Sequence, residues 1–272
     1  MADRTDPVVA ATAQGPVHVE RRLEGRRVLV VGGGRQSHGD PEAPAGNGQA
    51  VCVLSAVEGA RVAVADRDEA AARETVALVG DAAVPLVADV SDADDCATVV
   101  AAAAEALGGI DAVVLNVGVG FGELGLAGVE PKTWDRTLAV NLRSHALIAK
   151  HALPLLPPGG AFVFVSSIAA LRPGTRLPAY DASKAALIGL SRHVALEGSR
   201  RQVRANVVCP GLIDTPLGRE ASAGRSNRDR TPIPLGRQGT PWEVARTIVF
   251  LLSDEAGYIT GQTLAVDGGL SM

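Results

Sequence analysis

The chain has 272 residues, a net charge of −4 and an apolar fraction of 47%. This length and composition fit one large α/β domain with an ample core, and the acidic balance without a basic block argues against a nucleic-acid surface. Three widely spaced cysteines without a Cys-x-x-Cys pair imply neither a disulfide framework nor a thiolate metal site, which suits a reducing cytoplasm.

The N-terminal region is rich in small and polar residues. It lacks the compact apolar core of a signal peptide, and no uncharged apolar stretch of the chain is long enough to span a bilayer. We therefore expect a cytoplasmic protein without a membrane partner. Residues 1–25 are predicted to form a flexible arm and residues 26–272 a folded domain.

Strand and helix patterns alternate after the arm. Helical stretches include Gln49–Glu58 and Asp92–Leu107, the latter with acidic residues at its start and a Gly-Gly stop. Short Val- and Ala-rich runs between the helices are typical of buried parallel strands. These runs are Arg27–Val31, Arg61–Ala65, Val84–Val87, Ala112–Leu115, Ala161–Val165, Arg204–Val208 and Thr263–Val266. The alternation predicts an α/β chain: a single-domain Rossmann fold with a doubly wound parallel sheet of about seven strands and helices on both faces.

Tyr180 and Lys184 are four residues apart in a predicted helix, so both side chains lie on one face. A nearby ammonium favours the phenolate and lowers the pKa of a tyrosine, which makes the pair a candidate acid/base. The same spacing also occurs on exposed helices without function. The predicted strand Ala161–Val165 ends in Ser166-Ser167, at the edge where open α/β sheets place catalytic residues.

From about residue 25 to its end, the chain resembles the short-chain dehydrogenase/reductase family, with its Ser–Tyr–Lys set and Asn partner. By position in that pattern, Ser167 matches the catalytic serine, Tyr180 the acid/base, Lys184 its activator and Asn141 the asparagine of the proton relay. The resemblance implies an NAD(P)-dependent oxidoreductase, such as a ketoreductase, that acts on an alcohol/ketone substrate and forms a homotetramer. The apolar face of the helix over Ala182–Leu196 is a candidate interface.

The glycine-rich cofactor loop departs from the family pattern. After Val31, which replaces the usual threonine, the chain reads Gly32-Gly33-Gly34, and Gly46-Asn47-Gly48 follows only after an insertion over Arg35–Ala45 of about ten residues. The cluster still follows a strand and precedes a helix, the context in which backbone N–H groups hold a pyrophosphate. The insertion is either a tolerated surface excursion or a flap stiffened by prolines, with Arg35, Gln36 or Ser37 adding phosphate contacts.

Asp66 closes the second strand, where a carboxylate hydrogen-bonds the ribose hydroxyls and repels a 2′-phosphate. This favours NAD(H), while Arg67 and Arg35 keep NADP(H) possible; Asp66 could otherwise simply cap the next helix. The residues expected to contact the cofactor, by their positions in the family pattern, are Gly32, Gly46, Asn47, Gly48, Asp66, Asp89, Val90, Asn116, Gly118, Tyr180, Lys184, Pro210, Gly211, Ile213 and Thr215.

The substrate site is expected to involve residues 118–129 and 171–179 and the segment Arg219–Arg230, which is either a solvated loop or a closing lid. The first two are rich in apolar residues, which favours a largely apolar alcohol or ketone. No metal is expected, because His38, Asp40 and Glu42 lack a spacing that closes a tetrahedron. Two alternatives stay open: a sensor that binds NAD(H) without turnover, and a dehydratase or epimerase with the same catalytic set.

Overall fold

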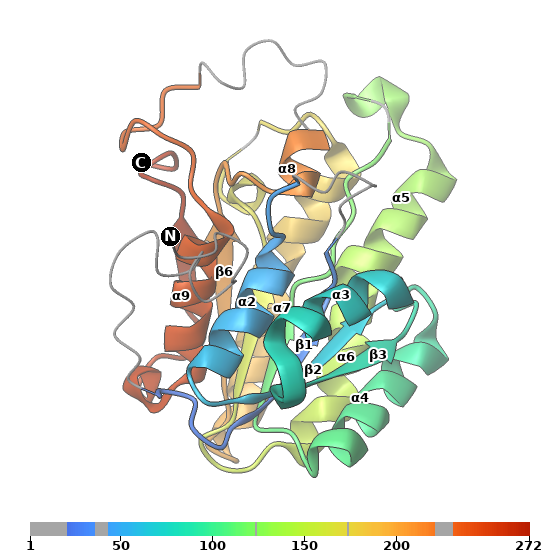
Figure 1. Cartoon of the computed structure of the whole chain (residues 1–272). Helices are drawn as coiled ribbons and strands as arrows, with labels where there is room; N and C mark the ends of the chain where they lie inside the picture. Colours follow the sequence, from blue (N-terminus) through green and yellow to red (C-terminus); the bar gives the residue numbers. More distant parts are fainter. Residues whose placement is uncertain (1–20, 36–42, 123, 173, 221–230) are drawn as a thin grey trace.

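The computed structural model describes residues 21–35, 43–122, 124–172, 174–220 and 231–272 (Figure 1). Its seven strands form one sheet in the order β3-β2-β1-β4-β5-β6-β7, with every neighbouring pair parallel. The strands are β1 (Arg27–Val31), β2 (Arg61–Asp66), β3 (Ala83–Val87), β4 (Ala112–Leu115), β5 (Ala161–Val165), β6 (Arg204–Pro210) and β7 (Thr263–Val266). The predicted fold class is therefore confirmed.

Helices cover both faces of the sheet (Figure 1). They are α2 (Asn47–Val57), α3 (Glu69–Val79), α4 (Ala93–Leu107), α5 (Pro131–Leu138), α6 (Ser144–Ala152), α7 (Pro178–Ser199), α8 (Pro216–Glu220) and α9 (Pro241–Leu252). One apolar core packs the sheet against α4, α6 and α7, and the other packs it against α2 and α9. Successive residues of β1 alternate between them: Leu29 belongs to the first core and Val30 to the second, because side chains alternate across a strand. Within the described part of the chain, no helix has the length and apolar character to cross a bilayer.

The predicted strands match the observed ones to within one or two residues. β2 and β6 run further than predicted, because Asp66 pairs with Val87 on β3 and Pro210 pairs with Val266 on β7. α2 begins at Asn47, two residues before the predicted start, so the last glycine of the cofactor loop lies within its first turn. These shifts matter for function, since they extend both strands at the carboxyl edge of the sheet, the edge at which α2 begins.

The folded part of the chain begins earlier than the predicted boundary at Gly25. Leu23 is fully buried, and its backbone N–H donates to the Glu58 carbonyl oxygen at 2.9 Å. Arg22 forms a 2.6 Å ion pair with the buried Glu58 carboxylate. Residues 21–25 are thus part of the packed domain, while the rest of the predicted arm, residues 1–20, lies outside the described residues.

Leu23→Ala should lower the free energy of unfolding by about 2–4 kcal/mol, because it leaves a cavity in the core around α2. Leu155→Ala is the matched control: that side chain is 48% exposed, and its loss should change stability by less than about 0.5 kcal/mol. Urea unfolding of the two variants checks the contrast. Equal, small effects would show that residues 21–25 do not belong to the folded unit.

Candidate active site

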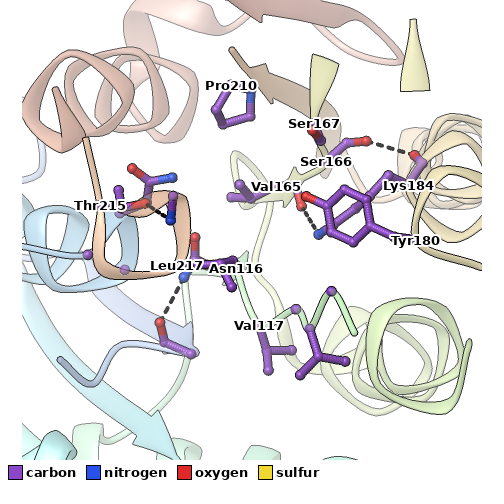
Figure 2. Close-up of a pocket in the computed structure, with 18 of the residues that line it drawn as sticks. Asn116, Val117, Val165, Ser166, Ser167, Tyr180, Lys184, Pro210, Thr215 and Leu217 are labelled. Carbon is purple, nitrogen blue, oxygen red and sulfur yellow. Dashed lines mark hydrogen bonds between the residues drawn. The ribbon is translucent and has the colours of Figure 1, made fainter. Parts of the chain in front are cut away.

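A cavity of about 600 Å³ opens at the carboxyl ends of the strands (Figure 2). Its lining includes residues at the ends of β1, β2, β4, β5 and β6: Val31, Asp66, Asn116, Ser166 and Pro210. This is the position in which open parallel sheets bind ligands. The cavity is therefore the candidate active site.

Three of the four predicted catalytic side chains, Ser167, Tyr180 and Lys184, line this cavity. Tyr180 and Lys184 lie in the first turns of α7, across the cavity from Thr215 in Figure 2. The Lys184 Nζ lies 5.8 Å from the centre of the Tyr180 ring. The helical spacing therefore does what the sequence predicts: it puts an ammonium beside a phenol, next to the end of β5.

The Lys184 side chain is 3% exposed, and its Nζ donates to the Val165 carbonyl oxygen at 3.0 Å. Burial lowers the pKa of this ammonium to about 8, because a charged group is poorly solvated there. The room for the ammonium comes from Gly118, where a Cβ atom would stand 2.9 Å from Nζ. A larger residue at this position would displace the Lys184 ammonium.

The two serines after β5 have different partners. Ser166 donates its hydroxyl proton to the Lys184 carbonyl oxygen at 2.7 Å, which ties the end of the strand to α7. The Ser167 hydroxyl accepts from the Ala169 N–H at 3.2 Å and caps the short 3₁₀ turn Ile168–Ala170. The cap fixes the Ser167 oxygen at the cavity wall, and among the described residues no acceptor takes its proton.

Asn141 is fully buried and does not line the cavity. It lies in a π-helical turn, Ala139–Arg143, between α5 and α6. Its side-chain oxygen accepts from the Val119 N–H at 2.8 Å, and its Nδ2 donates to the Val119 carbonyl oxygen at 2.9 Å and to Ser183 Oγ at 3.0 Å. Ser183 in turn donates to the Tyr180 carbonyl oxygen. Asn141 thus holds the loop after β4 and the first turn of α7 together.

The two separated halves of the glycine cluster meet in the structure. Gly32 and Gly34 from the first half and Gly46, Asn47 and Gly48 from the second all line the cavity. A Cβ atom on Gly48 would stand 1.9 Å from the Gly32 carbonyl oxygen, so no larger residue fits there. The Asn116 side chain donates to the same carbonyl at 2.8 Å. The start of α2 therefore packs directly on the turn after β1, which leaves backbone N–H groups at a cavity wall, as a pyrophosphate site requires.

The two residues that flank the predicted insertion lie close together: a Cβ on Gly46 would stand 4.0 Å from the Gly34 carbonyl oxygen. Arg35 does not line the cavity. Its guanidinium donates to Glu74 Oε1 at 2.5 Å and to the Ala43 carbonyl oxygen at 2.6 Å. These acceptors hold the Arg35 side chain against α3, so the phosphate contact expected of it stays a prediction that its position does not favour. Gln36 and Ser37, and the candidate metal group of His38, Asp40 and Glu42, lie outside the described residues.

Asp66 lines the cavity at the end of β2 and is nearly buried. Burial raises the pKa of its carboxyl group, against the opposing effect of N–H donors from Asp68 and Gly34. The Gly34 N–H donates to Asp66 Oδ2 at 3.0 Å, so the carboxylate also fixes the glycine loop. The helix-capping alternative is wrong, since α3 is capped by the Asp68 side chain.

The other residues predicted from the family pattern also line the cavity: Asp89, Val90, Asn116, Gly118, Pro210, Gly211, Ile213 and Thr215. Sequence reasoning missed Ser183, whose only signal was its place between Tyr180 and Lys184. It also gave no individual role to the lining residues Arg172, Leu177, Leu217 and Leu270. Of the expected lid, residues 221–230 lie outside the described residues, and Arg219 pairs with Asp214 at 2.7 Å.

Residues 43–271 match the family model described as enoyl-(acyl carrier protein) reductase. The chain is 34% identical to 2-(S)-hydroxypropyl-CoM dehydrogenase 3 of Xanthobacter autotrophicus, over 93% of this chain and 99% of the relative. The chain belongs to the short-chain dehydrogenase/reductase family. A solved family member from Brucella melitensis, a 3-ketoacyl-(acyl-carrier-protein) reductase complexed with NADH, has a TM-score of 0.82 and 30% identity, covering 92% of this chain and all of that one.

A second solved short-chain dehydrogenase, from Burkholderia cenocepacia in complex with NADP, has a TM-score of 0.83 and 32% identity, and again covers 92% of this chain and 100% of its own. Membership makes the protein an oxidoreductase that acts on CH–OH or C=O groups, in a family that binds nicotinamide cofactors. The two solved relatives hold different cofactors, so the likeness alone does not select one.

Burial of the Lys184 charge should give a measurable pH dependence of stability. The pKa of Lys184 is about 8 in the folded protein and 10.5 without burial, so between these values the unfolded chain binds more protons. The charge then destabilises the fold by about 3 kcal/mol below pH 8, and this cost is lost as the pH rises toward 10.5. Lys184→Met removes this cost. The variant should therefore be more stable than the wild type at pH 7, and the difference in the free energy of unfolding should be smaller at pH 10.

Urea unfolding of both proteins at the two pH values measures this difference, and other titrating groups cancel in the comparison. A gap that stays constant or widens toward pH 10 would contradict a low pKa at Lys184.

Proposed function

We propose that the protein interconverts an alcohol and a ketone with NAD(H), using Ser167, Tyr180, Lys184 and Asn141. The observation that carries this proposal is the position of Tyr180 beside a buried ammonium, in the same cavity as Ser167 and the glycine turn. The residues fit the cofactor, because Gly48 lets the start of α2 pack on the turn after β1 at the cavity wall, and Asp66 stands at the end of β2. When bound, the nicotinamide supplies or accepts the hydride.

The chain's own residues handle the proton. In the reducing direction, the Tyr180 hydroxyl gives its proton to the substrate oxygen as the C=O bond becomes C–OH, and in the oxidising direction the phenolate takes it back. The positive charge of the Lys184 ammonium stabilises the phenolate form of Tyr180. The Ser167 hydroxyl donates a hydrogen bond to the same substrate oxygen. Because this hydroxyl also caps the 3₁₀ turn, it is held at the cavity wall.

Asn141 supports this chemistry from behind the cavity wall. Its side-chain oxygen and Lys184 Nζ both approach Gly118: a Cβ there would stand 3.6 Å from the former and 2.9 Å from the latter. A water in this space would connect the ammonium to solvent, so that Tyr180 regains its proton after each turnover. The sensor alternative is less well supported, because the chain belongs to an enzyme family and its Ser, Tyr and Lys share one cavity.

The Asp66 carboxylate supports NAD(H) over NADP(H), since its charge lies where a 2′-phosphate would be placed. Arg67 also lines the cavity and is the residue that would tolerate that phosphate.

We also propose a homotetramer that uses the outer face of α7. Ala182, Ala185 and Gly189 are exposed on this face, and Leu196 is 70% exposed. A cytoplasmic location fits three buried cysteines without disulfides.

Tyr180→Phe should fold and bind NADH normally but lose turnover of an active ketone by about 10²-fold or more, because the proton donor is gone. NADH oxidation with a ketone panel, together with NADH fluorescence titration, checks both halves of this expectation. If the variant keeps near-normal kcat, Tyr180 is not the acid/base. A protein that binds NADH but oxidises it with no ketone would instead fit the sensor.

Asp66→Ala should reduce the preference for NADH over NADPH, because it removes both the ribose acceptor and the repulsion of the 2′-phosphate. The measurement is the Kd of each reduced cofactor for the wild type and the variant. Asp81→Ala is the control: this carboxylate, before β3, does not line the cavity, and its loss should leave both constants unchanged. Tighter binding of NADPH than NADH by the wild type would overturn the proposal.

A further inference from the structure

The substrate half of the cavity is the part formed by the segment from Ser167 to Tyr180, by α8 and by the C-terminal Leu270. Among the described residues, the lining of this half contains one cationic side chain, Arg172, and no carboxylate; outside this half, Lys184 on α7 also lines the cavity. Lys184 is buried and bound to a backbone carbonyl, whereas Arg172 is exposed to the cavity. Arg172 is therefore the cation that a substrate can reach.

Within the part of the chain that the structure describes, the Arg172 guanidinium has one hydrogen-bond partner: its Nη1 donates to the Leu270 carbonyl oxygen at 2.5 Å. Among the described residues, no carboxylate forms an ion pair with it. The acidic side chain at the start of α7, Asp181, accepts instead from the Thr175 hydroxyl. An arginine has five N–H donors, so Nε and Nη2 keep theirs for a ligand, and the Leu270 contact holds the plane of the group.

The surroundings of Arg172 indicate what else the ligand carries. The lining side chains Ile168, Leu177, Leu217 and Leu270 are apolar. The Arg172 N–H donates to the Ile168 carbonyl oxygen at 3.0 Å, so the arginine continues the turn that Ser167 caps. Ser167 and Arg172 stand at the two ends of this short segment, and both line the cavity. A substrate can thus reach both residues through a spacer of several bonds.

We propose that Arg172 binds an anionic group at the far end of the substrate, so that the substrate class is a ketone or alcohol with an apolar spacer and a terminal carboxylate or similar oxyanion. This inference rests on the proposed function, since it takes Ser167 and Tyr180 as the position of the reacting carbonyl. It refines the expectation of a largely apolar alcohol or ketone, because it adds a charged group to the end of the apolar spacer. A planar guanidinium suits such an anion, because two parallel N–H groups can bind two oxygens at once.

The test compares methyl-ketone carboxylates of increasing chain length with their methyl esters, which share the ketone and the spacer but lack the charge. The wild type should show a higher kcat/KM for the acid than for the ester at one favoured length. Arg172→Gln should reduce this acid-to-ester ratio by about 10- to 100-fold, mainly through the KM for the acid, as expected for the loss of a charge-assisted pair. Arg172→Lys should restore part of the ratio.

Arg200→Gln is the matched control, because Arg200 is exposed at the end of α7 and does not line the cavity; the ratio should not change. Thermal unfolding of each variant identifies any loss caused by the broken Leu270 contact alone. If the wild type does not prefer acids, or if Arg172→Gln lowers acid and ester equally, the anion-binding role is overturned while the oxidoreductase proposal stands.

A second readout does not depend on turnover. Calorimetric titration of the NAD⁺-saturated protein with the keto acid, which has no hydride to accept from the oxidised cofactor, should show binding in the wild type that weakens by the same factor in Arg172→Gln. Equal binding by both proteins overturns the role of Arg172. A different outcome is that no ketone oxidises NADH while the acid still binds in an Arg172-dependent way. This result would contradict the proposed reaction but support the anion site.

Discussion

The buried ammonium of Lys184 is the constraint to which the rest of the site is fitted. A charge in a poorly solvated place is costly unless it is paired, and the less expensive solution in proteins is a carboxylate partner. Here the Lys184 ammonium donates instead to the Val165 carbonyl oxygen, at the end of β5. A carboxylate would solvate the ammonium better but would cancel its field at Tyr180. A neutral carbonyl supports the charge and leaves the field in place.

Four separate segments of the chain hold this charge in place: the end of β5, α7, the loop after β4 and the turn that carries Asn141. Ser166 ties the end of β5 to α7 at the Lys184 carbonyl. Asn141 reaches both Val119, in the loop after β4, and Ser183, within the Tyr180–Lys184 turn. The π-helical turn at Ala139–Arg143 has one more residue per hydrogen-bonded loop than an α-helix, which allows Asn141 to point inward. Fully satisfied buried networks of this kind make a site rigid.

Much of the fold follows from local pattern. β1 and β5 are buried on both faces, so their Val- and Phe-rich runs stand out from the amphipathic helices beside them, and their ends were predictable. The Tyr180/Lys184 pair was equally visible, because a four-residue spacing is a property of the helix alone. The burial of Leu23 could not be predicted in this way, since a single leucine among charged residues is typical of an exposed segment. Its burial depends on Glu58, which lies far away in the chain and pairs with Arg22.

The two halves of the cavity differ in the same way. The cofactor half is made by strand ends and by glycine positions where close backbone approach excludes a side chain, such as Gly48 against Gly32. Such features require particular residue types, such as glycine, so each of them can be recognised from the sequence. The substrate half is assembled from segments far apart in sequence, and the contact between Arg172 and Leu270 joins two of them. Nothing in the neighbouring residues of either one predicts the other. Because Val165, Ser166 and Asn141 hold the catalytic groups without help from that contact, the residues that select the substrate can change while the proton chemistry stays in place.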